Sequence, residues 1–344
     1  MRPKPASGRI TLKEVAARAG VSASTASLVL TGKAEGRGIP AETNERVRRA
    51  AQDLNYAPNL LLRSLRRGRT HVVSFYNGFR HRFAKDLYMD RLSAAVEYAG
   101  GEYGYDVLVH CNFNRKPHEA YQFLNGGLSD GLLIFAPQLD DPLLGFLRRS
   151  ELSVVLLNGR DPLGQFPSVA DDSEEGMHLV ADALLKNGHR EIAVFVTDGY
   201  PDALKRSDLL RRLLAERGID LPERRVVGFT ENRAEKLKAL LDEPNPPTAI
   251  FCWHDRVAYW ALETCEELNV SVPEKLSIVG YDGIHWPAVT SHIAASIVVD
   301  LERLAAQGMR VLDLYIQGYE GPLIQENLPV AFSPGTTLGP APSS

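Results

Sequence analysis

Apolar residues near the start of the chain recur at intervals of three and four, the spacing that places them on one face of an α-helix. Thr11 and Glu14 have the spacing of a capping box, so a helix is predicted to begin at about Leu12. Gly20 follows the apolar stripe and is suited to the left-handed conformation that ends a helix. The apolar positions of this predicted helix are Leu12, Val15, Ala16 and Ala19.

A second short helix is predicted directly after this turn, with Ser22 as its N-cap. Its inward positions are Ala26, Val29 and Leu30, whereas its outer face carries Ala23, Ser24, Ser27 and Leu28, with Thr25 near the start. A third helix, from about Ala41 to Leu54, is predicted to bury Val47, Ala50, Ala51 and Leu54 and to expose Arg46, Arg48 and Arg49. Two helices joined as tightly as the first pair form a helix-turn-helix, whose second helix enters the major groove of DNA.

From His71 onward the pattern changes to short apolar runs separated by helical stretches, which is typical of a doubly wound parallel sheet. Two such series follow each other, so the sequence predicts two α/β lobes. The predicted strands are 72–76, 105–110, 131–136, 153–158, 192–196, 226–229, 249–253 and 276–282. Helices of the second series are predicted at 174–187, 202–217, 232–241 and 255–268. The chain is expected to cross between lobes near 160–168, 290–300 and 318–325, with a last helix, about Leu301–Tyr315, in the first lobe.

Ligands of such sheets bind beyond the carboxyl ends of the strands, and two such edges would face each other across a cleft. The residues that follow the predicted strands are therefore candidate ligand contacts. They are Tyr76, Asn77, Phe79, Asn158, Gly159 and Arg160 in the first lobe and Trp253, His254, Asp255 and Asp282 in the second. Carboxylates, arginine and aromatic faces together suit the vicinal hydroxyls and the apolar face of a sugar ring.

The charge of the chain is divided unevenly between its two parts. Residues 1–68 contain 13 Lys and Arg against 5 Asp and Glu, a net charge of +8. The remaining 276 residues contain 26 Lys and Arg against 38 Asp and Glu, a net charge of −12. A basic segment that coincides with a helix-turn-helix indicates a nucleic-acid-binding module attached to an acidic body.

The segment TLKEVAARAGVSASTASLVL, the third helix after it and the following NYAPN resemble the DNA-binding headpiece of the lactose-repressor (LacI/GalR) family of bacterial transcription regulators. The resemblance implies a small all-α headpiece at 9–57, a hinge segment at 58–69 and an effector-binding and dimerisation domain at 70–344. That domain would be α/β, similar to periplasmic sugar-binding proteins, with two doubly wound parallel sheets. Its first lobe would comprise about 70–165 and 297–320, and its second lobe about 166–296 and 321–340.

The resemblance also implies roles for individual residues. Bases would be read by Ala23, Ser24 and Leu28, and phosphates would be held by Ser22, Thr25, Ser27, Thr31 and Asn59. Leu65 falls where family members insert a leucine between base pairs of the minor groove, a wedge that kinks DNA. For the effector, the resemblance implies contacts at Arg206, Asp255 and Asp282. With residues that follow the predicted strands, the expected effector contacts are Arg206, Asp255, Asp282, Trp253, His254, Asn77, Phe79 and Arg160. Many members have asparagine at the position of His254.

Other kinds of site are not favoured by the sequence. Cys111, Cys252 and Cys265 are odd in number, far apart and without CxxC spacing, so we interpret them as buried thiols in a reducing compartment. No GxSxG, P-loop, HExxH or GxGxxG motif follows a predicted strand, so no catalytic residue, cofactor or metal is predicted. The sequence contains no apolar stretch of about 18 residues and no apolar run of a signal peptide near its start. We therefore expect a cytoplasmic, nucleoid-associated protein without a membrane partner.

Together these features predict a homodimer that binds double-stranded operator DNA and responds to a small molecule. The favoured interpretation is a repressor of sugar-utilisation genes that a sugar inducer releases from DNA. The alternative is a corepressor-dependent repressor, or an activator, with a nucleoside or purine-type effector. A DNA-tethered glycoside-processing enzyme and an architectural DNA-binding protein are less favoured, because a large cleft-forming domain is better explained by reversible ligand binding.

Overall fold

The structure is a computed structural model that describes residues 10–34, 36–57, 64, 68–80, 82, 86–138, 140–161, 163–197, 201–286 and 290–342. The chain divides into two compact units, Met1–Thr70 and His71–Ser344. Across the described ranges, no helix is both long enough and apolar enough to cross a membrane.

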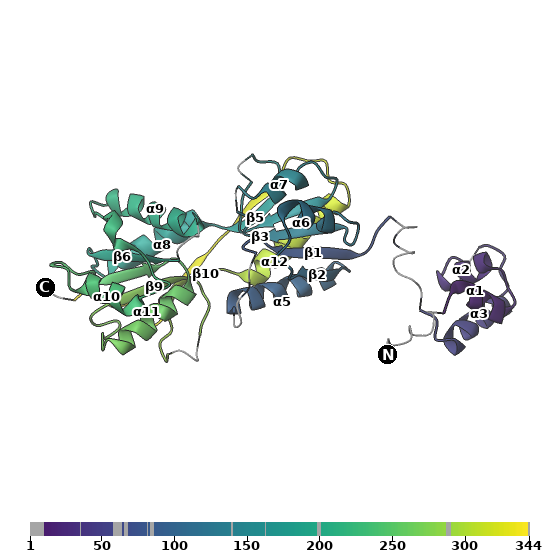
Figure 1. The fold of residues 1–344 in the computed structure, drawn as a ribbon, viewed down its shortest axis with the longest axis horizontal. Coiled ribbons are helices and arrows are strands. Elements are labelled where there is room, and N and C mark those ends of the chain that lie inside the picture. The colour runs from purple at the N-terminus through teal and green to yellow at the C-terminus, as the bar shows by residue number, and fades with distance from the viewer. Residues whose placement is uncertain are drawn as a thin grey trace, which may run out of the picture. The chain divides into compact units, whose positions relative to one another are not determined.

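The small unit contains three helices, α1 (Leu12–Ala19), α2 (Ala23–Leu30) and α3 (Ala41–Asp53), and each lies within a residue of its predicted range (Figure 1). One apolar side of each helix faces a common core. The buried residues of this core include Val15, Ala16, Ala19, Ala26, Val29, Val47, Ala50 and Ala51. Leu30 and Leu54, which were predicted to point inward, are only half-buried at the edge of the core.

Helix α1 is fixed at both of its ends. The Thr11 hydroxyl accepts from the Glu14 N–H at 3.3 Å and the Glu14 carboxylate accepts from the Thr11 N–H at 2.6 Å, which confirms the predicted capping box. Gly20 ends α1 with a φ of +65°, a conformation that costs glycine little. Arg46 of α3 donates from its Nε to the Ala19 carbonyl at 3.2 Å and thereby holds the end of α1.

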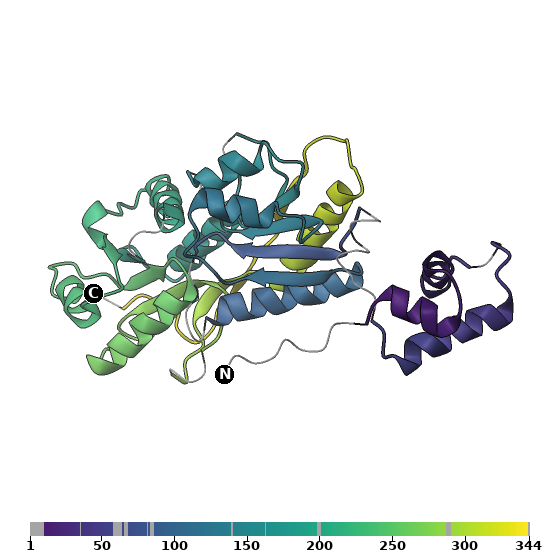
Figure 2. The same ribbon diagram turned by 45° about the vertical axis from the view of Figure 1, so that its right-hand side comes forward.

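The first lobe of the large unit is a six-stranded, all-parallel sheet in the order β11-β5-β4-β3-β1-β2. Helices α5 and α12 cover one face and α6 and α7 the other (Figure 2, where α5 is the blue helix below the strands). The strands are β1 (Val72–Asn77), β2 (Asp106–His110), β3 (Gly131–Phe135), β4 (Ser153–Leu157), β5 (Ser168–Asp171) and β11 (Gln325–Leu328). The helices are α5 (Leu87–Glu102), α6 (Pro117–Leu124), α7 (Pro142–Leu147) and α12 (Leu301–Ile316).

The second lobe is also six-stranded, in the order β12-β10-β9-β8-β6-β7, with β12 antiparallel to β10 and the other pairs parallel. Its strands are β6 (Ile192–Val196), β7 (Val226–Gly228), β8 (Ala249–Cys252), β9 (Ser277–Asp282), β10 (Ala295–Val298) and β12 (Ala331–Ser333). Its helices are α8 (Ser173–Lys186), α9 (Pro201–Ala215), the 3-10 turn η1 (Glu223–Arg225), α10 (Arg233–Leu241) and α11 (Asp255–Glu267).

The central strands are apolar throughout because both faces of each sheet are covered by helices. In β3, Leu132 and Ile134 pack with α6 and α7, whereas Leu133 and Phe135 point to the opposite face and pack with α5 and α12. The predicted parallel strands therefore agree with the observed ones to within about one residue. The predicted last helix also lies in the first lobe, as α12.

The predicted lobe boundaries are wrong at two places. Residues from 166 and from 321 were assigned to the second lobe, but β5 and β11 pair with each other at the edge of the first sheet. The chain instead crosses between lobes at 171–173, 298–301 and 328–331. Neither strand contains a continuous apolar run, since β5 has the sequence SVAD and the edge strand β11 has QENL, so the sequence pattern did not reveal them.

Candidate functional site

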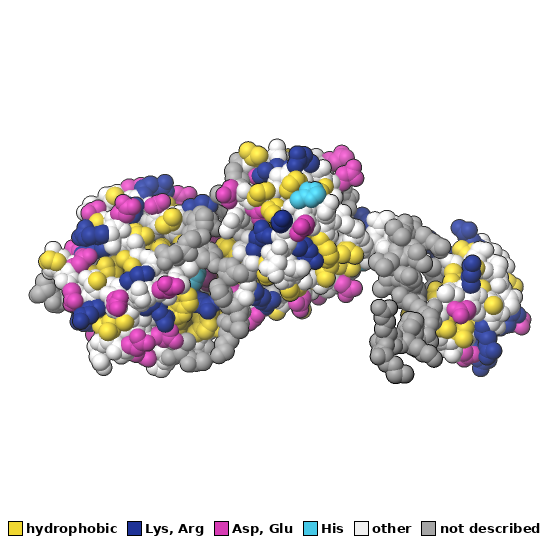
Figure 3. Space-filling view, in the orientation of Figure 1, with side chains coloured by type: hydrophobic (Ala, Val, Ile, Leu, Met, Phe, Trp, Pro, Cys, Tyr) yellow, Lys and Arg dark blue, Asp and Glu magenta, His cyan; other side chains and the backbone are white. Residues whose placement is uncertain are grey.

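In the small unit, the outer face of α2 is exposed where the sequence predicted a DNA-reading surface. Ser22 caps the helix, its Oγ accepting from the Thr25 N–H at 3.1 Å, and its hydroxyl lies 3.1 Å from that of Ser24. The predicted contacts Ser22, Ala23, Ser24 and Thr31 are exposed, and Thr25, Ser27 and Leu28 are half-buried. Figure 3 shows lysine and arginine side chains on the surface of this unit. Asn59 and Leu65 lie outside the described residues.

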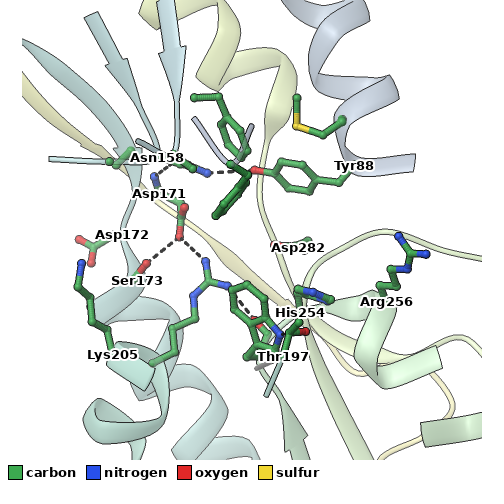
Figure 4. Close-up of a pocket in the computed structure, with 18 of the residues that line it drawn as sticks. Tyr88, Asn158, Asp171, Asp172, Ser173, Thr197, Lys205, His254, Arg256 and Asp282 are labelled. Atoms are coloured by element: carbon green, nitrogen blue, oxygen red, sulfur yellow. Dashed lines mark hydrogen bonds and ion pairs between the residues drawn. The ribbon is translucent and has the colours of Figure 1, made fainter. Parts of the chain in front are cut away.

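In the large unit, a cavity of about 1040 Å³ lies between the carboxyl ends of the two sheets. Seven of the eight predicted effector contacts line this cavity. They are Asn77, Phe79, Arg160, Arg206, Trp253, His254 and Asp282. Asp255 does not line it. Residues near one another in space but far apart in the sequence complete the lining, among them Tyr88, Asn158 and Asp171 (Figure 4).

Asp282 lines the cavity and is half-buried, and its carboxyl group takes part in no hydrogen bond among the described residues. Its φ of +113° is strained for a residue with a side chain, and such strain is typical of functional sites. Burial raises the pKa of this carboxyl well above its usual value. The carboxyl group of Asp282 can therefore form hydrogen bonds with the hydroxyl groups of a ligand in the cavity.

Arg206 on α9 is held beside Asp282 by contacts with three other residues. Its Cζ lies 3.6 Å from the centroid of the Tyr281 ring, and its Nη1 donates to the Trp253 carbonyl at 2.8 Å. Its Nη2 lies 3.7 Å from Asp171 Oδ2. The guanidinium is therefore positioned before any ligand arrives, which lowers the entropic cost of binding.

A chain of hydrogen bonds continues from Arg206 into the first lobe. The Tyr281 hydroxyl donates to Asp171 Oδ2 at 2.6 Å, and the Asp171 N–H donates to Asn158 Oδ1 at 3.0 Å. Asn158 in turn donates from its Nδ2 to the Tyr88 hydroxyl at 3.0 Å. This interlobe network, which comprises Tyr88, Asn158, Asp171, Arg206 and Tyr281, connects α5 of one lobe with α9 of the other. Asp171 was not among the expected effector contacts, and no local sequence pattern distinguishes Tyr88 or Tyr281.

His254 is the N-cap of α11, and this role fixes its tautomer. Its Nδ1 accepts from the Val257 N–H at 3.2 Å, so the proton of the neutral ring lies on Nε2. Burial, with a contribution from the Arg206 charge, lowers the pKa of His254 to about 3. The residue therefore offers the cavity one N–H donor.

Ligand affinity should not respond to His254 protonation between pH 8 and 5, because a histidine with a pKa of about 3 stays neutral throughout this range. Nitrogen-15 NMR of the histidine side chains should show the Nε2–H tautomer for His254 and no titration. A chemical shift for His254 that moves with a midpoint near pH 6.5 would contradict this assignment.

Aromatic faces line the cavity from both lobes. Phe79 and Tyr88 pack against Phe135, with ring centroids 5.8 and 5.5 Å apart. Trp253 is fixed by a hydrogen bond of 2.9 Å from its Nε1 to the Thr197 hydroxyl, and its ring lies 4.3 Å from that of His254. Rigid aromatic faces beside a few convergent polar groups are typical of small-molecule sites.

The prediction for Asp255 is wrong, because its carboxyl group points away from the cavity. Asp255 is 1% exposed and accepts from the Ile284 N–H at 2.5 Å and the Ser296 hydroxyl at 2.6 Å. Burial raises the pKa of its carboxyl to about 8. A Cβ at Gly280 would lie 2.1 Å from Asp255 Oδ1, so the carboxyl occupies a closed space beside β9. Asp255 joins α11 to β9 and β10.

The cysteines and acidic residues do not form a metal site within the described parts of the chain, where no group of three or more potential ligands is present. Cys252 and Cys265 are buried, as predicted. Cys111 is exposed, so the interpretation of all three as buried thiols is wrong for this residue. Cys111 directly follows β2, the edge strand of the first sheet.

Comparisons with known families agree with both units. Residues 11–59 match the family described as bacterial regulatory proteins, lacI family, and residues 181–338 match the periplasmic binding protein-like domain. The HTH-type transcriptional repressor PurR of Vibrio atlanticus is 29% identical over 284 residues, which cover 80% of this chain and 82% of PurR. PurR of Actinobacillus pleuropneumoniae is 28% identical over 310 residues, which cover 88% of this chain and 90% of that protein.

Solved structures have the same fold over nearly the whole chain. The lac repressor dimer bound to operator and the anti-inducer ONPF has a TM-score of 0.79 at 22% identity, covering 96% of this chain and 100% of its own. The complex of the transcriptional regulator CelR with cellobiose has a TM-score of 0.69 at 25% identity, with the same coverage. The helix-turn-helix, the two-lobed cavity and these similarities together assign the chain to the lacI family of bacterial DNA-binding transcription regulators.

Proposed function

We propose that this protein is a homodimeric repressor whose binding to operator DNA is controlled by a sugar that lodges between the two lobes. The observation that carries the proposal is the convergence of Asp282, Arg206 and His254 with aromatic faces in one large cavity. The small unit supplies a separate exposed helix for DNA. A single chain therefore has the two distinct sites that ligand control of DNA binding requires.

The polar groups of the cavity suit a ring with several neighbouring hydroxyls. Asp282 accepts hydrogen bonds when ionised and donates one when protonated, whereas His254 Nε2 and the Arg206 guanidinium donate. Trp253 and Phe79 offer flat faces to the apolar side of a sugar ring. The carboxylate of Asp171 already accepts from Tyr281 and pairs with Arg206, so it is not available as a general acid or base. This arrangement favours binding over glycoside hydrolysis.

On DNA, we propose that α2 lies in the major groove with Ala23, Ser24 and Leu28 toward the bases. Their small and apolar side chains can contact thymine methyl groups, and Ser24 can donate or accept a hydrogen bond. The remaining predicted contacts, Ser22, Thr25, Ser27, Thr31 and Asn59, would bind phosphates. Leu65 would wedge between base pairs of the minor groove at the centre of a pseudopalindromic site.

Ligand control follows if the lobes differ in their relative position with and without sugar. A ligand can shift DNA affinity only as far as it binds the two arrangements of the lobes with different affinity. Most of the interlobe network lines the cavity, so a sugar that contacts Arg206 of the second lobe would also act on the first lobe through Asp171 and Asn158. We propose that the sugar favours the arrangement with lower operator affinity.

The experiment has two steps. Selection from a randomised duplex pool gives a preferred site, and fluorescence anisotropy then measures operator affinity with a panel of sugars and a panel of purine bases and nucleosides. We expect at least one sugar to lower operator affinity, while purified protein leaves that sugar chemically unchanged. No preference among duplexes, or an affinity that no metabolite alters, would overturn the proposal.

A purine effector is the second candidate. Repressors named PurR are among the relatives, and the aromatic faces of the cavity would also stack on a purine base. The two panels distinguish the candidates. If purine bases or nucleosides altered operator affinity and no sugar did, the effector would be a purine and not a sugar.

Leu65→Ala should weaken binding to the selected site on the order of tenfold, because the variant loses the proposed wedge in the minor groove. Binding to a random duplex should change little, since nonspecific affinity depends on phosphate contacts. Anisotropy titrations against both duplexes measure this split. Equal losses of affinity for the two duplexes would show that Leu65 does not act as a wedge at the selected site.

A further inference from the structure

The cavity continues past its central polar groups toward a second set of lining residues. Asp86 comes from the first lobe, and Arg256, Trp260 and Trp286 come from the second. Figure 4 places Arg256 on the opposite side of Asp282 from Asp172 and Lys205. Arg256 and the pair Asp172 and Lys205 therefore line different sides of the cavity. We refer to Asp86, Arg256, Trp260 and Trp286 as the outer group.

Helix geometry gives the separation between the two regions. His254 caps α11 and Trp260 lies six residues further along, a distance of about 9 Å at about 1.5 Å per residue. The Trp286 ring lies 5.6 Å from that of Tyr259, which precedes Trp260 on α11. The outer group therefore lies beside a later part of α11 than Trp253 and His254 do.

The outer group also has a donor, Arg256, and an acceptor, Asp86, which come from opposite lobes and whose charges interact. Asp86 caps α5, where its Oδ1 accepts from the Met89 N–H at 3.3 Å, and one carboxylate oxygen remains for other partners. Burial raises the pKa of Asp86, while the positive charge of Arg256 acts in the opposite direction across the cavity. The Arg256 Cζ lies 5.1 Å from the Trp260 ring centroid. Polar and aromatic groups are therefore combined here as they are around Asp282.

We propose that the cavity has two ring subsites, so that the effector is a disaccharide or a longer saccharide rather than a single sugar ring. One ring lies at Asp282, Arg206, His254 and Trp253, and the next ring lies against Trp286 and Trp260, between Asp86 and Arg256. A volume of about 1040 Å³ supports this assignment, since it is at the upper end of the about 300–1,000 Å³ that encloses drug-sized ligands. The inference rests on the proposed function and makes its sugar class more specific.

Isothermal titration calorimetry of the full chain tests the proposal with hexoses and with their α- and β-linked disaccharides. We expect one disaccharide to bind at least tenfold more tightly than its component hexoses. Trp286→Ala should reduce disaccharide affinity about tenfold and hexose affinity by no more than twofold, because stacking on one ring contributes a free energy of that order. Trp253→Ala should reduce both affinities by similar factors. Tyr103→Ala, at an exposed tyrosine outside the cavity, is the control.

The outcomes separate this inference from the proposed function. A hexose that binds as tightly as every disaccharide and controls operator binding would overturn the two-subsite assignment and leave the sugar-controlled repressor intact. Binding of purines alone would overturn both. Circular dichroism checks that Trp286→Ala is folded, and Trp286→Leu replaces it if it is not. A disaccharide affinity unchanged in the folded variant would also overturn the assignment.

Discussion

Replacing Arg206 with alanine should abolish the response of operator binding to the ligand and lower the free energy of unfolding by about 3–5 kcal/mol. The Arg206 side chain is 16% exposed, and its removal deprives the Asp171 carboxylate, which is 4% exposed, of its cation. The Tyr281 ring also loses the guanidinium that lies 3.6 Å from its centroid. Chemical denaturation measures the stability, and anisotropy with and without ligand measures the response.

Arg212→Ala is the matched control because it removes an arginine from the same helix. Arg212 is 59% exposed and forms an ion pair of 3.2 Å with Glu174, which is 67% exposed. Exposed pairs of this kind contribute between about 0 and 1 kcal/mol, so the control should remain stable and ligand-responsive. If Arg206→Ala kept a normal ligand response, the cavity would not be the effector site.

Asp255→Ala should lower the free energy of unfolding by about 2–5 kcal/mol, although the residue does not line the cavity. The variant leaves the Ile284 N–H and the Ser296 hydroxyl buried without their acceptor. Each buried donor that loses its partner costs about 1–3 kcal/mol. Denaturant titration of the full chain measures the loss.

The matched control for Asp255 is Asp300→Ala, which removes an exposed aspartate that caps α12 through the Arg303 N–H at 2.8 Å. Loss of such a cap costs about 1 kcal/mol. In the folded fraction of Asp255→Ala, ligand affinity should stay within a few fold of the unsubstituted protein. A stable Asp255→Ala protein that had lost ligand binding would restore Asp255 to the list of ligand contacts.

The strands could be predicted where they are buried on both faces of a sheet. The prediction failed for the strand that lies at the edge of the first sheet. The run 131–136 agrees with β3 because helices on both sides of the sheet require apolar residues at every position. The edge strand β11, QENL, is partly exposed and polar, and only its pairing with β5 makes it a strand. The local sequence does not indicate that pairing, so the predicted lobe boundaries lie several residues before the observed crossings.

The candidate site could be predicted as far as it follows from strand ends. Asn77, Trp253 and Asp282 line the cavity because the carboxyl ends of parallel strands meet at one edge. The same rule failed for Asp255, because the first turn of α11 directs its side chain toward β10 and away from the cavity. The interlobe network was missed because its members come from five separate elements, and only the tertiary structure brings them together.

The three chain crossings at 171–173, 298–301 and 328–331 have a consequence for how such proteins can diversify. Each lobe is built from two stretches of chain. A genetic exchange within the large unit would therefore combine parts of two proteins in the lobes that line the cavity. The small unit is one continuous stretch that ends at Thr70. Recombination at that junction would join a complete small unit to a complete large unit from another protein. We expect such chimaeras to have the DNA preference of one parent and the ligand preference of the other.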